Sequence, residues 1–472
     1  MQLPIVAPAP IVSAHAQAFR HLFNDVRQFE HFQNYLTGLI VLENKSLANI
    51  SRCLLESADK TNLSRFLSES PWQPQAVNKF RIQYVLAQTV TIRPEAKQGY
   101  LIFDDTLCEH VGNLFEYVER HYDHCDGTYP LAHNLVTSHY LSGAVRIPID
   151  FALYRRYKEV TQWEWFVHQH FPTPVIPSTA RERQSLHKQL DQELLKDPKF
   201  AELHAQFSTK IEIAQALLTQ AIEQGVPFTT VLMDSWYLSA QLVAALAEAN
   251  KDWVSLLKRN RKLETHSFQL KDATGQPLVL PHPHIKVETL VPLIPASAYR
   301  QVKLTGQSYW CFSFCVRLEG LGKVRLVVSF DHRDLTGTYA VLITNCTHWS
   351  AKQILDHYLH RWPIETFYRD SKQLLGLDEY RTRTYAANEA HWCLVFVAYS
   401  LLHLGCLPPP SRAGKGKPST IPNKTIGELC RQQAQAVIEE LILFAHSLLQ
   451  QGCSASQLWR KLFDKQTKEV LV

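Results

Sequence analysis

The chain has 472 residues, of which 46% are hydrophobic and 11% aromatic, and its formal net charge is +5. A chain of this length usually holds more than one domain, and its share of apolar residues excludes an intrinsically disordered protein. A net charge so close to zero neither requires nor excludes a nucleic-acid partner, so local clusters of basic residues carry that information.

The sequence shows no sign of secretion or of a membrane anchor. Its ten cysteines are scattered without a C-x-x-C pair, which is typical of free thiols in a reducing compartment rather than of a zinc site or a disulfide framework. The apolar N-terminal stretch lacks a preceding basic segment, and no apolar run reaches the roughly 18 residues of a membrane span. We therefore expect a cytoplasmic protein that does not bind a membrane.

Residues 1–95 have aromatic and aliphatic side chains at helical steps, for example Phe19, Phe23, Phe29 and Phe32. This pattern predicts several short helices joined by polar turns. Such a bundle suits a DNA-binding domain, and it suits a protein-interaction domain equally well.

The segment QGYLIFDDTLC at 98–108 predicts a buried strand with two carboxylates near its end, Asp104 and Asp105. Side chains alternate along a strand, so these two point to opposite faces and only one can join a site on a given face. A turn or a cap is the alternative role for adjacent aspartates. Residues 129–151 predict two more strands around a turn, and residues 180–224 a charged helical segment.

Residues 228–262 predict a strand, an acid, a helix and a second strand, the pattern of a central sheet covered by helices. Asp234 ends the first strand, where open α/β sheets place their ligands, although it could also cap the following helix. The second strand leads into a basic cluster with Lys258, Arg259 and Lys262, which could contact phosphate groups.

Residues 264–345 alternate β-branched and aromatic side chains with polar ones and predict a mostly antiparallel β-region. The expected strands lie at 287–293, 309–317, 323–330 and 339–344. Tyr309 and Trp310 could stack on an unpaired base, but aromatic residues in strands more often belong to a core.

Residues 358–372, YLHRWPIETFYRDSK, predict one amphipathic helix. Four charged residues share one face at steps of four, four and three: Arg361, Glu365, Arg369 and Lys372. Aromatic residues such as Trp362 and Phe367 are expected to pack against the protein. A solvated ladder of ion pairs would give the same charge pattern, but the strand-end acids upstream favour a metal site.

The order Tyr358, Arg361, Glu365, Lys372, with two, three and six residues between them, resembles the Y-R-E-K signature of a large branch of DDE transposases from bacterial insertion sequences. The chain continues into LLGLDEYRTR, which is also similar to that branch. The resemblance implies an α/β fold with a ribonuclease-H-like catalytic core, a β-strand insertion, and helical N- and C-terminal regions.

The resemblance also implies a division of the chain into five parts. These are a helical DNA-binding domain (1–95), the first part of the core (96–263), the β-rich insertion (264–345), the final helices of the core (346–405), and a linker with a helical C-terminal region (406–472). The linker is expected within residues 408–420, which are rich in proline, glycine and basic residues.

In that branch a D-D-E triad of carboxylates holds two Mg²⁺ or Mn²⁺ ions, which prefer oxygen ligands. The resemblance implies Asp234 and Glu365 as the second and third acids. The first is followed by threonine directly or one residue later, so Asp105, before Thr106, is our choice and Asp104 the alternative. The DNA-binding residues implied by signature or charge are Tyr358, Arg361, Lys372, Arg369, Lys258, Arg259 and Lys262.

The implied activity is that of a DNA transposase. Metal-activated water would free a 3′-hydroxyl at the transposon end, and this hydroxyl would attack the opposite strand or target DNA. The expected partners are double-stranded DNA, as transposon ends and target, and a second copy of the chain on that DNA, at the bacterial nucleoid. A DNA-binding descendant without catalysis, or a nuclease that cuts without joining, remains an alternative.

Overall fold

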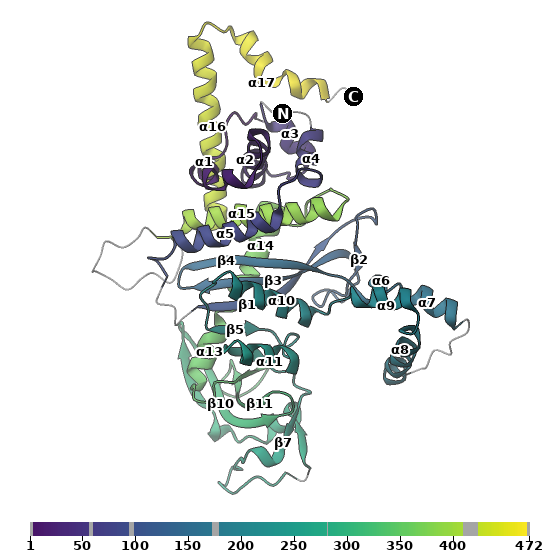
Figure 1. Cartoon of the computed structure of the whole chain (residues 1–472). Helices are drawn as coiled ribbons and strands as arrows, with labels where there is room; N and C mark the ends of the chain where they lie inside the picture. The colour runs from purple at the N-terminus through teal and green to yellow at the C-terminus, as the bar shows by residue number, and fades with distance from the viewer. Residues whose placement is uncertain are drawn as a thin grey trace.

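The computed structural model of the protein describes residues 3–55, 60–93, 99–171, 179–280, 282–408 and 423–469. One mixed sheet of ten strands runs through the molecule, with helices on both faces and a helical layer at one end (Figure 1). The observed class is therefore α/β with helical flanks, as the sequence predicts.

The first part of the sheet contains five long-range paired strands. They are β1 (Tyr100–Glu109), β3 (Leu131–Ser142), β4 (Val145–Tyr154), β5 (Thr230–Met233) and β6 (Asp252–Leu256), in the spatial order β4-β3-β1-β5-β6. β1, β3 and β4 are antiparallel, whereas β5 and β6 run parallel to β1. A short strand, β2 (Glu119–Arg120), pairs with the start of β3. This arrangement is the expected ribonuclease-H-like core.

The insertion extends the same sheet beyond β6. β12 (Tyr339–Thr344) pairs with β6, and β11 (Gly322–Phe330), β10 (Gln307–Leu318) and β9 (Arg300–Leu304) follow in antiparallel order. β7 (Lys262–Glu264) and β8 (His284–Lys286) form a separate pair. Three of the four predicted insertion strands are thus confirmed.

The predicted strand at 287–293 is wrong. This segment forms α12 (Val287–Leu290) and a 3-10 turn (Val291–Leu293). The buried side chains Val287, Leu290 and Val291 recur at steps of three and one, which is a helical spacing. Pro292 also lacks the N–H group that a strand ladder would need.

Helices cover the two faces of the sheet. One face carries α10 (Lys210–Glu223) and α11 (Ala240–Glu248). The other carries α13 (Ala351–Leu359) and the start of α14 (Pro363–Leu375). The expected single helix at 358–372 is therefore two helices, because Pro363 starts α14 and residues 360–362 form a turn before it. Trp362 in this turn is 66% exposed, contrary to the expected packing, whereas Phe367 is buried.

The two ends of the chain build one helical layer. The N-terminal helices are α1 (Pro10–Ala16), α2 (Val26–Val41), α3 (Leu47–Cys53), α4 (Lys60–Ser68) and α5 (Pro74–Gln88), with a 3-10 segment at Gln17–Leu22. They share a hydrophobic core with α15 (Tyr385–Cys406) and α16 (Ile426–Gln450), as Figure 1 shows. α17 (Ala455–Glu469) follows α16. All but the first residue of the expected linker at 408–420 lies outside the described residues.

The sequence predicts no apolar run long enough to cross a membrane, but α15 has sufficient length and hydropathy to do so. However, 83% of its most apolar window is buried inside the protein, as in the core helix of a globular fold. α15 is accordingly the central helix of the terminal helical layer.

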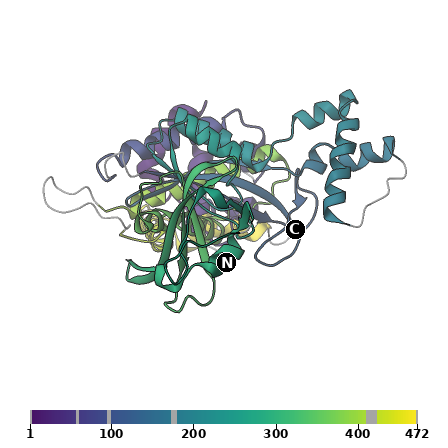
Figure 2. The ribbon, with the colours of Figure 1, turned by 90° about the horizontal axis from the view of Figure 1, so that it is seen from below.

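A small helical arm projects from the sheet between β4 and α10 (Figures 1 and 2). It contains α6 (Tyr157–Val160), α7 (Trp163–His170), α8 (Ala180–Leu194) and α9 (Pro198–Ala205). The arm has its own hydrophobic cluster, centred on Phe166, Leu194 and Phe200. The sequence predicts the helical character of 180–224 but not a separate unit.

Candidate active site

Two aspartates occupy adjacent positions on neighbouring strands. Asp234 directly follows β5, whereas Asp104 lies inside β1, which continues to Glu109, so the predicted end of that strand at the two aspartates is wrong. β1 and β5 are parallel, and Phe103 stands opposite Met233. Asp104 and Asp234 follow these residues, so they occupy adjacent positions, and residues at the same level of a parallel pair point to the same face. Burial is the largest cause of the raised pKa of Asp104, and the charge of Asp234 adds to it.

The glutamate comes to the same face on a helix. Ile102 and Leu232 precede Asp104 and Asp234 by two residues and therefore point to the same face of the sheet. Both share a hydrophobic cluster with Ile364 of α14. Ile364 is buried beneath the helix and Glu365 follows it in the first turn. The sheet and α14 therefore bring Asp104, Asp234 and Glu365 to one face of the core.

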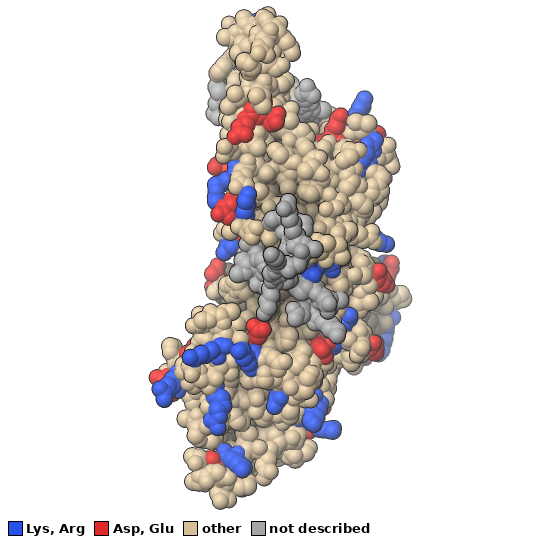
Figure 3. Space-filling model, turned by 90° about the vertical axis from the view of Figure 1, so that its left-hand side faces the viewer, with Lys and Arg blue, Asp and Glu red and all other residues tan. Residues whose placement is uncertain are grey.

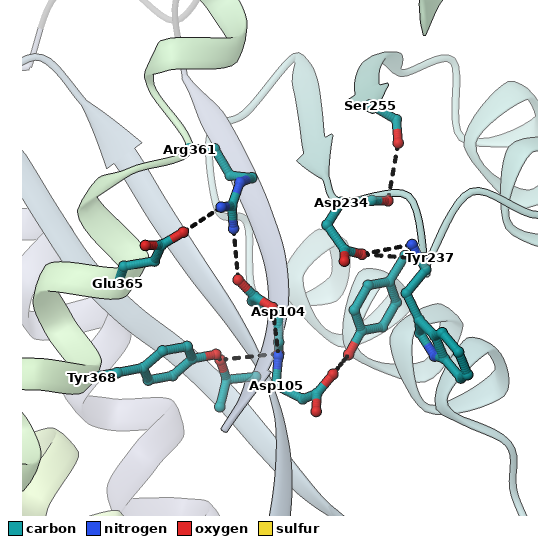
Figure 4. Close-up of polar contacts among 10 residues, drawn as sticks. Asp104, Asp105, Asp234, Tyr237, Ser255, Arg361, Glu365 and Tyr368 are labelled. Carbon is teal, nitrogen blue, oxygen red and sulfur yellow. Dashed lines mark hydrogen bonds and ion pairs between the residues drawn. The ribbon is translucent and has the colours of Figure 1, made fainter. Parts of the chain in front are cut away.

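An arginine connects two of these carboxylates (Figure 4). Arg361, in the turn before α14, donates from Nη1 to Oδ2 of Asp104 at 2.6 Å. Its Nη2 donates to Oε1 of Glu365. The guanidinium group is thus the internal counter-ion of the acidic site.

Asp105 points to the opposite face, as strand alternation predicts. Its Oδ2 accepts from Nζ of Lys210 at 2.7 Å, and its Oδ1 accepts from the hydroxyl of Tyr237 at 3.0 Å. Lys210 belongs to α10 and Tyr237 follows β5, so both lie on the face away from Glu365. This placement favours Asp104, the alternative, over our sequence-based choice of Asp105, because Asp104 shares the face of Glu365. The strand pattern alone does not reveal which face α14 covers.

Burial and neighbouring acids set the protonation of the site. Burial raises the pKa of Asp104 to about 7, the charges of Asp105 and Asp234 add to this effect, and Arg361 opposes it. A positive ion near Asp104 therefore relieves an unfavourable concentration of negative charge.

Asp234 stabilises the turn after β5, whereas the cap of the following helix α11, the alternative role expected for Asp234, is Ser239. Oδ1 of Asp234 accepts from the backbone N–H groups of Trp236 at 2.8 Å and Tyr237 at 3.3 Å, which stabilises the turn after β5. Its backbone carbonyl accepts from the hydroxyl of Ser255 at 3.0 Å. Both carboxylate bonds use Oδ1, so capping the turn does not consume Oδ2.

Tyr368 is a site residue that the sequence reasoning missed. Its hydroxyl forms a 2.6 Å hydrogen bond with the hydroxyl of Thr137, the residue opposite Asp104 in β3. Burial, and then the charge of Asp104, raise the pKa of Tyr368 well above its ordinary value, so the phenol stays neutral. Its spacing of three residues from Glu365 was a usable signal, since such residues share a helix face. No sequence pattern, in contrast, indicated that Lys210 would pair with Asp105.

The donor chemistry of the three carboxylates fits Mg²⁺ or Mn²⁺, which take oxygen ligands. In this conformation Arg361 lies between Asp104 and Glu365, and within the described part of the chain no three His, Cys, Asp or Glu residues are close enough to hold a metal ion. Asp104, Asp234 and Glu365 could thus hold the ions, and the guanidinium group of Arg361 lies between two of them.

The other signature residues surround the acids. Lys372 of α14 donates from Nζ to the backbone carbonyl of Leu107 in β1 at 2.6 Å. Tyr358 is half-buried, with Arg361 6.0 Å from its ring centroid. Arg369 is exposed and pairs with its neighbour Asp370 at 3.0 Å.

The basic cluster after β6 is exposed. Nζ of Lys258 lies 5.0 Å from the ring centroid of Trp236. Arg259 stacks over Tyr339 at 4.2 Å and donates to its backbone carbonyl, and Lys262 lies on β7.

The predicted stacking residues of the insertion are partly built into the sheet. Trp310 packs against the core on one face of the sheet, and Tyr309 against the core on the other. The hydroxyl of Tyr309 donates to Gln307 at 2.6 Å. Both environments agree with the structural role that aromatic residues usually have in strands.

Comparison with known proteins identifies the family. The sequence profile described as DDE superfamily endonuclease matches residues 18–308, which are more than half of the chain and include Asp104 and Asp234. A protein described as "Probable transposase for insertion sequence element IS701", from Microchaete diplosiphon, is 24% identical over 264 residues, which cover 55% of this chain and 57% of the relative. This chain thus spans little more than half the length of that relative. By the extent of the profile match, the chain belongs to the DDE superfamily endonuclease family.

Proposed function

We propose that the protein is a DNA transposase that cleaves transposon ends and joins them to target DNA. The observation that carries this proposal is the gathering of Asp104, Asp234 and Glu365 on one face of the core, with Arg361 as their counter-ion. Membership of an endonuclease family and the similarity to a probable transposase support it.

Each carboxylate has a distinct support for its role. Asp104 lies within β1, Asp234 directly follows β5, and Glu365 lies in the first turn of a helix whose apolar side is buried. Two divalent ions held there would activate the attacking oxygen and stabilise the leaving oxygen. Tyr368 remains neutral beside Asp104, because burial and then the charge of Asp104 raise its pKa. Arg361 must leave at least one carboxylate when that carboxylate binds a metal.

We further propose that basic residues around the acids bind the DNA backbone. Tyr358, Arg361, Arg369 and Lys372 lie on or between α13 and α14, and Lys258, Arg259 and Lys262 lie after β6. Arg361, once released from Asp104, could donate two parallel bonds to a phosphate. On the face shown in Figure 3, Lys and Arg side chains also predominate over the β-insertion, whose exposed basic residues include Arg300, Lys303 and Lys323.

The partners and location follow from the same proposal. Joining two transposon ends requires that both be held together, which a homodimer on DNA would do. The protein would act in the cytoplasm, at the nucleoid. The apolar helix α15, being mostly buried, is compatible with this location.

The test is cleavage and joining of a labelled transposon-end duplex, taken from the DNA that flanks the gene, with Mg²⁺ or Mn²⁺. We expect Asp104→Asn, Asp234→Asn and Glu365→Gln to abolish metal-dependent products while DNA binding persists. Asp105→Asn should retain substantial cleavage, and Glu440→Gln, an exposed change on α16, serves as the matched control.

The products separate the alternatives. Joined products in the wild type support a transposase, and cleavage without joining indicates a nuclease of the same fold. Tight binding without cleavage indicates a DNA-binding descendant. Loss of cleavage in Asp105→Asn but not in Asp104→Asn would show that the first acid is Asp105.

A further inference from the structure

An exposed tryptophan stands beside the acidic site. Trp236 follows Asp234 by two residues, and its backbone N–H donates to Oδ1 of that aspartate at 2.8 Å. The side chain is nevertheless 52% exposed. A short turn therefore fixes a large aromatic surface next to a strand-end carboxylate, where it gains little from burial.

Two lysines flank this ring. Nζ of Lys258 lies 5.0 Å from the ring centroid, and Nζ of Lys210 lies 5.8 Å from it. Lys210 is held in place by its 2.7 Å ion pair with Asp105. Asp105 thus positions a lysine on the face of the sheet away from Glu365.

The aromatic surface continues into the loop between β2 and β3. The ring centroid of His124 lies 6.5 Å from that of Trp236, and the ring of Tyr122 lies 4.8 Å from His124. Tyr129 extends the row, 5.0 Å from Tyr122. All four side chains are exposed, and we refer to Trp236, His124, Tyr122 and Tyr129 as the aromatic row.

The loop that carries most of the row is ordered and close to the site. The backbone N–H of Asp123 donates to Thr128 at 2.9 Å, and that of Gly127 donates to Asp123 at 2.9 Å. The row thus runs from the turn after Asp234 into this loop.

Exposed aromatic rings in series are unusual, because proteins generally bury such surface. The rings contact one another at angles of 50–89°, so bases cannot insert between them. An exposed ring face can accept an unpaired base by stacking, whereas paired bases in a duplex already stack on each other. The exposed Lys258 supplies positive charge for the phosphates, whereas the charge of Lys210 is paired with Asp105, and Asp123 and Asp126 in the loop oppose phosphate binding. Stacking tolerates any base, so the site would recognise single-stranded DNA without strong sequence preference.

We propose that the aromatic row, with Lys210 and Lys258, binds a short single-stranded segment of DNA and leads it to the carboxylates. This inference rests on the proposed function, and it adds the form of DNA that the site takes next to the scissile bond. Base stacking on Trp236 positions that strand, and Lys258 contacts its backbone.

The experiment measures fluorescence anisotropy of the full chain with labelled oligothymidine of about twelve nucleotides and with a duplex of the same length. Trp236→Ala should weaken binding of oligothymidine about tenfold or more, and Trp236→Phe should restore most of it. Duplex binding should change less than about twofold. Trp459→Ala, at a comparably exposed tryptophan (51%) on α17, should leave both affinities unchanged.

Equal binding of oligothymidine by wild type and Trp236→Ala would overturn the inference, as would an equal loss for single strand and duplex. If Trp236→Ala lowers the melting temperature, Tyr129→Ala decides, because it changes the far end of the row. Asp104→Asn and Glu365→Gln should still bind oligothymidine. If Trp236→Ala binds oligothymidine as well as wild type does while the acid variants fail to cleave DNA, only this inference is refuted. If oligothymidine binding depends on Trp236 but Asp104→Asn still cleaves DNA fully, only the assignment of Asp104 is refuted.

Discussion

At the scale of single residues, Arg361 compensates the negative charge of the acidic site. It is the shared partner of Asp104 and Glu365, and only 16% of its side chain is exposed. Replacing it by Ala leaves two neighbouring carboxylates without their cation. We expect Arg361→Ala to lower the free energy of unfolding of the metal-free protein by about 1–3 kcal/mol. Added Mn²⁺ should restore most of this loss.

Urea unfolding followed by circular dichroism, with and without Mn²⁺, measures both effects. Arg361→Lys keeps the charge but not the forked geometry, so it should fall between wild type and Arg361→Ala. If Mn²⁺ stabilised wild type and Arg361→Ala by the same amount, Arg361 would not share a position with the metal.

The protonation of Asp104 predicts how the site responds to pH. Its pKa is raised from the ordinary 3.8 to about 7, mainly by burial. Between these values the folded protein keeps a proton that the unfolded chain has lost, so this group's contribution to stability falls as pH rises from about 4 to about 7. Metal binding requires the carboxylate, so Mn²⁺ affinity should rise with pH up to about 7 and then level off.

Isothermal titration with Mn²⁺ at about pH 6 and about pH 8 tests this dependence. Thermal unfolding of Asp104→Asn should lack the corresponding loss of stability over the same range. A Mn²⁺ affinity that is flat between the two pH values would contradict a raised pKa at Asp104.

The sequence predicted most residues of the candidate site but not the face of the sheet on which they lie. Strand alternation correctly placed Asp104 and Asp105 on opposite faces, and strand ends indicated Asp234. Which face α14 covers depends on packing between segments more than 250 residues apart in the chain, as the 257-residue separation of Arg361 and Asp104 shows. Local patterns carry no record of such a contact.

At the scale of elements, the boundaries of α14 position Glu365. The sequence predicted continuous helix from 358 to 372 because its charges keep helical spacing, but the spacing does not reveal the break at Pro363. The opposite end is set by Gly376, which has φ +70° and caps the helix. A Cβ atom there would lie 2.5 Å from Cγ of Lys45, in the turn before α3.

Gly376→Ala should therefore destabilise the protein by about 1–3 kcal/mol, through its left-handed backbone and the clash with Lys45. Gly452→Ala is the matched control, since it has φ +86° with no atom within 4 Å and should lose only the backbone part, about 1 kcal/mol. Thermal unfolding of the two variants compares them directly. Equal losses would mean that Lys45 moves aside without cost.

At the scale of the whole molecule, the terminal helices and the sheet are joined by buried contacts. The sequence predicted helical regions at both ends but not that they meet, because no local pattern links α2 or α5 to α15. The structure shows them in one hydrophobic core, with α5 and α15 also against β4. The N-terminal region is therefore packed against the central sheet through its own helices.

Arg81 is the main polar contact in this junction. It is completely buried on α5 and donates to the backbone carbonyls of Pro148 at 2.8 Å and Ile149 at 2.7 Å in β4. It also donates to the hydroxyl of Ser400 in α15 at 2.8 Å and to Asn78 on its own helix. One side chain thus connects two helices from distant parts of the sequence to the edge of the sheet.

Arg81→Met keeps most of the apolar volume but leaves these acceptors without a donor, so we expect a loss of about 3–5 kcal/mol in the free energy of unfolding. Arg65→Met is the control, because Arg65 forms only an exposed ion pair with Glu69 and its loss should cost less than about 1 kcal/mol. Urea unfolding followed by tryptophan fluorescence and by circular dichroism measures both. If the junction couples the helical layer to the sheet, the unfolding midpoints from both probes shift equally in Arg81→Met. A separate transition of the helical layer at lower urea, with the sheet still folded, would show that the terminal helices fold independently.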